Sequence, residues 1–157
     1  MRVVVVGGSA SNVGKTALAA HLLSGEPAAA KVAMKMSVRE QPCDLRVLVL
    51  TAETSAEHRH DCERLLAAGA THVVWVTVQR HGVRSGLAAG LRRVRALRPE
   101  VVVIESTSAG IELARPAASW FVAGAGEWKA WADRHRVRAH RVLTTDEVFG
   151  LIADPAP

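Results

Sequence analysis

The sequence predicts a three-layer α/β fold, in which a mostly parallel sheet of six to seven strands carries helices on both faces. Short apolar, β-branched runs alternate along the chain with segments of helical spacing, as expected for parallel strands joined by crossover helices. The first run, Val3–Val6, is continuous rather than alternating, which is typical of a strand covered on both faces. The chain has 157 residues, so we expect a single domain over residues 1–157.

The elements follow from local patterns, taken in chain order. A helix from Lys15 to about Ser24 should end at Gly25 and Pro27. Two pairs of residues, Thr54 with Glu57 and Thr144 with Glu147, have capping-box spacing and should each begin a helix. Further strands are expected at Lys31–Met36, Arg46–Leu50, Val73–Val78, Val101–Ile104, Ser119–Val122 and, at one edge, Val137–Leu143; further helices are expected at about Ala56–Ala68, Val83–Arg98, Glu127–His135 and from Thr144 through Ile152.

Composition and charge limit the class of protein. Apolar residues make up 49% and aromatic residues 4%, so the core must consist mainly of Val, Leu and Ala. Cys43 and Cys62 are too few for a disulfide framework, and no apolar run is long enough for a signal peptide or a membrane span. We therefore expect a cytoplasmic protein that does not bind membranes.

The net charge is +5, which favours an anionic partner. Much of the excess lies in two arginine clusters, Arg92–Arg98 and Arg134–Arg141. No nucleic-acid-binding motif accompanies them, so we interpret them as solvated faces and do not expect nucleic acid as a partner.

The strongest functional signal is the stretch Gly7–Thr16, GGSASNVGKT, which follows the first strand and opens the first helix. Such a loop turns successive N–H groups toward phosphate oxygens, and the positive end of the helix dipole adds to them. Lys15 should reach the β- and γ-phosphates, and the Thr16 hydroxyl should bind Mg²⁺. The nucleotide-binding set expected from the motif is Gly8, Ser9, Ala10, Ser11, Asn12, Val13, Gly14, Lys15, Thr16 and Ala17.

The spacing of the glycines departs from the common motif. Four residues normally separate the two glycines, which would place Ser9 where glycine is expected. Gly8 lies five residues before Gly14, so either the loop is one residue longer or it starts with Ser9.

Two resemblances follow from these residues. GSASNVGKT, Gly8–Thr16, resembles the loop of dethiobiotin synthetases, which has the same longer spacing and a Val before the second glycine. DCERLLAAGATHVVWV, Asp61–Val76, and PEVVVIES, Pro99–Ser106, are similar to segments of the molybdopterin-guanine dinucleotide biosynthesis protein B family, in the same order. The chain thus resembles P-loop NTPases over most of residues 1–110.

The resemblance implies a GTP- or ATP-binding protein that hydrolyses nucleotide slowly and assists a partner in cofactor synthesis. Proteins of this family often dimerise, so a homodimer is also expected. Both families carry a lysine at the position of Lys35, directed toward phosphates or substrate. The matched segment assigns Asp61 to Mg²⁺ or substrate. The alternative for Lys35 is a surface lysine that packs its stem on the sheet.

Glu105 ends an apolar strand at the sheet edge where ligands bind in open α/β folds. Its carboxylate would hold Mg²⁺ or polarise the attacking water, and the alternative is a helix cap. Catalytic roles are accordingly expected for Lys15, Glu105 and Lys35, and metal binding for Thr16, Glu105 and Asp61. Arg64, one helical turn after Asp61, would either stabilise phosphate charge or pair with Asp61.

Other polar and aromatic groups are weaker candidates. His58, His60 and Cys62 would share a face only on a strand, and we expect a helix, which disfavours zinc. Ser106–Ser108 would contact substrate or form an ordinary turn, and Trp120, Trp128 and Trp131 are expected to pack in the core rather than stack on a base. No Asn-Lys-x-Asp motif occurs, so ATP and GTP both stay open.

Three functions fit these observations. The first is Mg²⁺-dependent NTP binding and slow hydrolysis by an accessory protein of cofactor biosynthesis. The second is an ATP-dependent small-molecule ligase or kinase of the dethiobiotin synthetase kind, in which Lys35 and Ser106–Ser108 hold the substrate. The third is a non-catalytic module that binds a partner according to its nucleotide.

Overall fold

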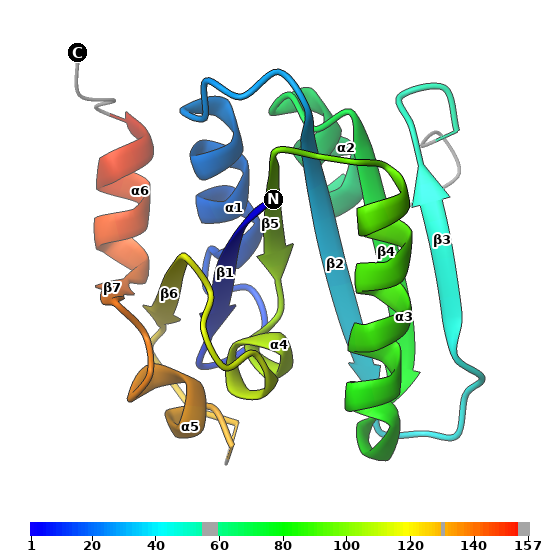
Figure 1. Ribbon diagram of the computed structural model, residues 1–157. Helices are drawn as coiled ribbons and strands as arrows, with labels where there is room; N and C mark the ends of the chain where they lie inside the picture. Colours follow the sequence, from blue (N-terminus) through cyan, green and yellow to red (C-terminus); the bar gives the residue numbers. More distant parts are fainter. Residues whose placement is uncertain (55–59, 130, 154–157) are drawn as a thin grey trace.

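The computed structural model describes residues 1–54, 60–129 and 131–153. There the chain forms a seven-stranded sheet in the order β3-β4-β2-β5-β1-β6-β7 (Figure 1). The strands are β1 (Arg2–Gly8), β2 (Lys31–Arg39), β3 (Arg46–Leu50), β4 (His72–Gln79), β5 (Val101–Glu105), β6 (Ala118–Ala123) and β7 (Arg141–Thr144). The helices are α1 (Lys15–Ser24), α2 (His60–Ala67), η2 (Arg80–Gly82, a 3₁₀ turn), α3 (Val83–Ala96), α4 (Thr107–Glu112), α5 (Asp133–Arg136) and α6 (Thr145–Ala153).

The mostly parallel sheet is confirmed. Every neighbouring pair runs parallel except β3, which lies antiparallel to β4 at one edge. The inner strand β1 explains the unbroken valine run, because Val5 and Val6 are fully buried, on opposite faces of the sheet. Each such side chain contributes roughly 1.5–3 kcal/mol by its removal from water.

Helices cover both faces, as expected for a three-layer fold. One apolar core contains Leu18 of α1, Leu65 of α2 and Val148 of α6. The other core contains Leu87 of α3 and Ala109 of α4. In Figure 1, α3 and α4 lie in front of the sheet, and α1 and α2 lie behind it.

Two expected elements near the C-terminal end are wrong in their bounds. Residues 127–129 of the expected helix Glu127–His135 have no regular secondary structure, and the helix there is only α5. The Lys129 N–H donates to the Ser9 carbonyl (2.9 Å), and the Trp128 indole N–H donates to the Gly124 carbonyl (3.1 Å). The bond to Ser9 ties the segment to the loop after β1, so a tertiary contact overrides its helical spacing.

The expected edge strand Val137–Leu143 is also too long. Residues 137–139 continue the turn of α5, with the Val137 N–H bonded to the Asp133 carbonyl (3.0 Å), and β7 begins only at Arg141. The prediction began the strand at Val137 because this residue is apolar and β-branched. Its side chain is 73% exposed, however, and packs in neither core.

The two capping boxes have different outcomes. The Thr144 N–H donates to Glu147 Oε2 (2.6 Å) and the Glu147 N–H donates to Thr144 Oγ1 (3.2 Å), so the box that begins α6 is confirmed. The pairing of Thr54 with Glu57 lies partly outside the described residues. The helix expected at Ala56–Ala68 is described as α2, from His60 to Ala67.

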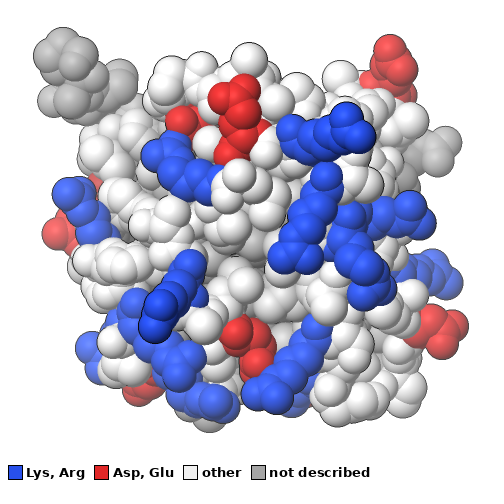
Figure 2. Space-filling model, viewed as in Figure 1, with Lys and Arg blue, Asp and Glu red and all other residues white. Residues whose placement is uncertain are grey.

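The arginine clusters lie on the surface. Arg92, Arg93 and Arg95 on α3 are exposed, as are Arg134 and Arg136 on α5. Figure 2 shows Lys and Arg side chains over the face of the sheet that α3, α4 and α5 cover. In the described part of the chain, no helix is long and apolar enough to cross a membrane.

The strand order brings three carboxyl ends together. In the sheet, β5 lies between β2 and β1, with Glu105 in register with Lys35 on one side and Val6 on the other. The loop after β1 and the residues that end β5 and β2 therefore share one edge, as expected for ligand binding in an open α/β sheet.

Candidate functional site

The loop between β1 and α1 turns through two left-handed residues, Asn12 (φ 58°) and Gly14 (φ 98°). Gly14 precedes the first turn of α1 and provides no side-chain cap for its N–H groups. Free N–H groups at a helix start, together with the helix dipole, favour an anion in front of them. This geometry fits the phosphate loop that the motif predicts.

The unusual glycine spacing has a steric explanation. β1 continues through Gly8, where a Cβ atom would lie 2.8 Å from Val13 Cγ2 and 3.0 Å from the Val122 carbonyl oxygen. Only glycine fits there without a shift of the loop or of β6. The loop itself starts with Ser9, the second of the two readings of the spacing.

Ser9 is fully buried, and each of its nitrogen and oxygen atoms has a hydrogen-bond partner. Its N–H donates to the Val122 carbonyl (2.9 Å), and its Oγ accepts from the Gly124 N–H (2.9 Å). Its carbonyl accepts from the Lys129 N–H (2.9 Å). A serine at this position thus binds the loop to the residues after β6. A glycine would lack the bond between Oγ and the Gly124 N–H.

Lys15 lies along the loop, where its Nζ donates to the Ala10 carbonyl. Burial lowers the pKa of Lys15 to about 8; the charge of Glu105 opposes this, whereas nearby Lys129 adds to it. An ammonium group in such surroundings gains from an anion placed beside it.

Lys35 is the centre of a buried ionic network. Its Nζ lies 2.9 Å and 3.0 Å from the two carboxylate oxygens of Glu105, and 2.9 Å from Asp61 Oδ2. Thr16 Oγ1 donates to Glu105 Oε2 (3.0 Å). The alternative of a surface lysine is excluded, because Lys35 is 8% exposed. The alternative of Glu105 as a helix cap also fails, because Ser106 Oγ accepts from the Ala109 N–H at the start of α4.

The pKa shifts follow from this pairing. Burial opposes the charge on Lys35, but Glu105 and Asp61 outweigh it and raise the pKa of Lys35. For Asp61, burial acts to raise the pKa, but the hydrogen bond and charge of Lys35, the nearby Thr16 hydroxyl and the charge of Arg64 together lower it. Both groups are therefore charged at neutral pH, and Asp61 pairs with Lys35 rather than with Arg64.

A cleft of about 480 Å³ opens over these groups. Of the residues expected to bind nucleotide, Ser11, Asn12, Gly14, Lys15, Thr16 and Ala17 line it. Gly8, Ser9, Ala10 and Val13 are not among its lining residues; Ser9 and Val13 are buried behind it. Lys35, Asp61, Arg64 and Glu105 also line the cleft, so the expected catalytic and metal-binding residues meet there.

A second cavity of about 300 Å³ adjoins the cleft and shares Ser11, Lys15, Glu105 and Lys129 with it. Ser106, Thr107 and Ser108 form one side; the turn expected at these residues is instead the N-cap and the first two residues of α4. The Thr107 hydroxyl already has two hydrogen-bond partners in the protein: it donates to the Gly8 carbonyl (2.9 Å) and accepts from the Gly8 N–H (3.0 Å).

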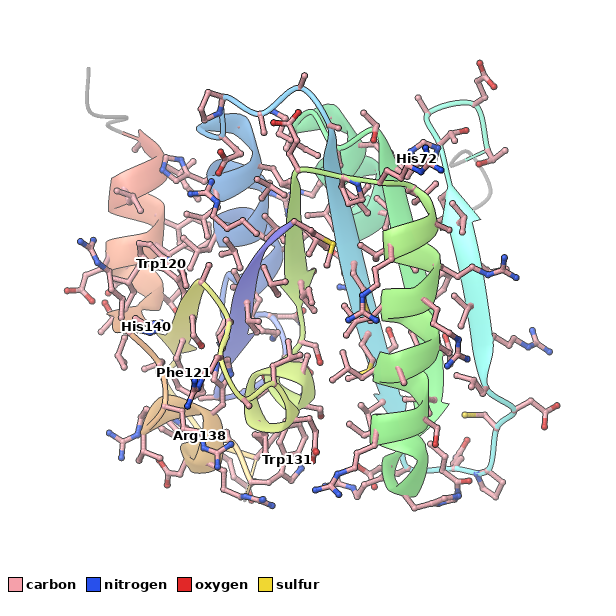
Figure 3. The ribbon with its side chains drawn as sticks, viewed as in Figure 1. His72, Trp120, Phe121, Trp131, Arg138 and His140 are labelled. Carbon is pink, nitrogen blue, oxygen red and sulfur yellow. The ribbon has the colours of Figure 1, made fainter. Side chains whose placement is uncertain are left out.

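Sequence reasoning missed several residues of these cavities, among them Arg39, Glu40, Arg80 and Lys129. Their positions depend on how loops from β2, β4 and β6 converge, which no local motif records. Arg80 pairs with Glu40, and its guanidinium lies 5.3 Å from the Trp131 ring centroid. Figure 3 shows Trp131 below α4, near the sheet edge where the strands β1, β2 and β5 end.

The tryptophans have separate environments. Trp120 packs against the α1 core, as expected, and Trp128 packs against Phe121 with ring centroids 5.7 Å apart. Trp131 instead lines the second cavity.

No cluster of three or more His, Cys, Asp or Glu side chains suited to a metal occurs among the described residues. His60 is fully exposed and Cys62 fully buried, so they face apart on α2, while His58 lies outside the described residues.

Comparison of the chain with models of protein families, with curated proteins and with solved structures finds no match. The function therefore has to be argued from the geometry of this site and from the motif that it contains.

Proposed function

We propose that this chain is a P-loop nucleotide-binding protein that binds ATP or GTP with Mg²⁺ and hydrolyses it slowly. The observation that carries the proposal is the loop from Ser9 to Gly14, which ends at an uncapped helix start beside the partly buried Lys15 and in front of a cleft of about 480 Å³. These groups suit a chain of phosphates because they present N–H donors and an ammonium group to one volume.

The charge of the two cavities supports an anionic ligand. Among the described residues, their lining contains more basic than acidic side chains: Lys15, Lys35, Arg39, Arg64, Arg80 and Lys129 against Glu40, Asp61 and Glu105. A triphosphate would offset this excess, whereas an uncharged ligand would not.

Thr16 and Glu105 fit a Mg²⁺ ion. Their oxygens are 3.0 Å apart, and two ligands at right angles with bonds of about 2.1 Å would be separated by about 3.0 Å. Asp61, whose pKa the nearby Thr16 hydroxyl helps to lower, would hold the ion through water. When bound, the ion would neutralise charge on the β- and γ-phosphates.

The same network accounts for slow hydrolysis. Glu105 would orient the attacking water, but Lys35 donates to both of its oxygens. A carboxylate held in this way has little capacity to accept a proton from water. Its contribution would be orientation and charge rather than strong base catalysis.

The resemblance to molybdopterin-guanine dinucleotide biosynthesis protein B supports a role as an accessory protein in cofactor synthesis. The second cavity favours one alternative, an ATP-dependent ligase or kinase of the dethiobiotin synthetase kind, because it offers room for an acceptor beside the phosphates. A non-catalytic binding module is the remaining alternative. A hydrolase releases phosphate from NTP alone, a ligase or kinase requires its acceptor, and a module releases none.

The proposal is tested by thermal unfolding of the wild type with ATP, GTP, CTP and UTP in the presence of Mg²⁺. A ligand at 100 times its Kd adds about 2.7 kcal/mol, which for a chain of this size raises Tm by roughly 5–10 °C. Lys15→Ala should lose this shift, whereas Arg95→Ala, which removes an exposed charge on α3, should keep it. An absence of any shift in the wild type, or equal shifts in the wild type and Lys15→Ala, would contradict the proposal.

A further inference from the structure

The segment Gly124–Lys129 is fastened to the phosphate loop. Ser9 bonds to the N–H groups at both ends of this segment, through its Oγ to Gly124 and through its carbonyl to Lys129 (each 2.9 Å). Val13 also packs closely against Gly124, since a Cβ atom at Gly124 would lie 2.3 Å from Val13 Cγ1. The main chain of Lys129 is therefore bonded to the loop, while its side chain is exposed.

The Lys129 side chain is directed to the site. It lines both the cleft and the second cavity, and its charge helps to lower the pKa of Lys15. Its Nζ lies 5.4 Å from the centroid of the Trp131 ring. A cation near an aromatic ring is stabilised modestly, by about 0.5–1 kcal/mol at an exposed site, so an anion would readily draw it away.

Two other cations of the site already have partners, whereas Arg39 and Arg64 line the cleft without an ion pair among the described residues. Lys35 is bonded to Glu105 and Asp61, and Arg80 is paired with Glu40. No carboxylate in the described residues lies within ion-pair distance of Lys129. The position of Lys129 and its lack of an ion-pair partner there both point to a ligand anion next to the one held by Lys15.

We propose that Lys129 is a catalytic residue that contacts the terminal phosphate of the bound nucleotide; this inference rests on the proposed function. In hydrolysis the water oxygen bonds to the γ-phosphorus. The bond from phosphorus to the β–γ bridging oxygen breaks, with its electron pair left on the diphosphate. The proton from water passes to the released phosphate or to solvent. Lys129 stays protonated throughout and offsets the charge on the transferring phosphoryl oxygens.

This role predicts a specific pattern in variants. Lys129→Ala and Lys129→Gln should lower single-turnover hydrolysis by roughly 10²-fold and leave the Kd for the diphosphate within about two- to three-fold of wild type. The affinity for diphosphate with Mg²⁺ and aluminium fluoride, which imitates the transferring group, should fall with turnover. Lys129→Arg should retain much of both, and Arg95→Ala should match wild type.

The bond from the Lys129 N–H to Ser9 involves main chain alone, so all three Lys129 variants should keep the fold. Hydrolysis by Lys129→Ala within about two-fold of wild type, or an equal loss of affinity for diphosphate and triphosphate, would overturn the role of Lys129. A wild type that binds no nucleotide would instead overturn the proposed function, so the two failures are distinguishable.

Discussion

Removal of the Lys35 ammonium should destabilise the protein more than any exposed charge change. Lys35→Met keeps the length of the side chain and takes away three contacts at 2.9–3.0 Å, two to Glu105 and one to Asp61. Glu105 is 6% exposed, so its carboxylate would remain as a buried charge without a cation. Breaking one side of such a pair costs about 3–5 kcal/mol.

The contact with Asp61 adds little to this loss. The Asp61 side chain is 41% exposed, and ion pairs in contact with water are worth about 0–1 kcal/mol. We therefore expect Lys35→Met to lower the free energy of unfolding by about 4 kcal/mol, which lowers Tm by roughly 8–16 °C.

Urea unfolding followed by tryptophan fluorescence measures this loss, and a double-mutant cycle assigns it. Glu105→Gln in the Lys35→Met background removes the unpaired charge, so the double variant should be more stable than Lys35→Met alone. A loss below about 1 kcal/mol for Lys35→Met, or full additivity in the cycle, would refute the argument that these two groups depend on each other.

Three further outcomes follow from the site and its surroundings. Glu105→Gln should keep nucleotide binding and lose turnover in a phosphate-release assay; undiminished turnover would remove Glu105 from the mechanism. Gly8→Ala should weaken both folding and nucleotide binding, measured by Tm and Kd, because its Cβ would meet Val13 at 2.8 Å and the Val122 carbonyl at 3.0 Å. Burial lowers the pKa of His135 to about 4 from 6.5, so the unfolded chain takes up a proton first as the pH falls. Stability should therefore drop by up to about 3 kcal/mol between pH 6.5 and 4, and His135→Gln should flatten that part of the urea-derived profile; an unchanged slope would contradict it.

Much of the fold could be predicted because its signals are local. The valine run of β1, the stop at Gly25 and the capping box at Thr144 each depend on a few neighbouring residues. The two errors have different causes. The segment that contains Lys129 has helical spacing, but its main chain bonds to distant Ser9 instead. Val137 looks like a strand residue, although it lies on the surface and its N–H bonds locally to Asp133.

The site divides in the same way. Three residues that line the cleft could be singled out from sequence: Lys15 and Thr16 by the Gly-Lys-Thr stretch between a strand and a helix, and Glu105 by its place at the end of an apolar strand. Lys129 could not be recognised in this way, because its place beside the cleft depends on a main-chain hydrogen bond to Ser9, which lies 120 residues earlier in the sequence.

The sequence by itself determined the alternation of strands and helices and the turn that joins the first strand to the first helix, since both depend on side-chain periodicity and turn chemistry within short windows. Tertiary structure alone decided that β5 lies between β2 and β1, and hence that Lys35 reaches Glu105 and Asp61. The reason is physical: strand order depends on the packing of apolar faces across the whole sheet, so which charges meet at the strand ends cannot be read from any one strand.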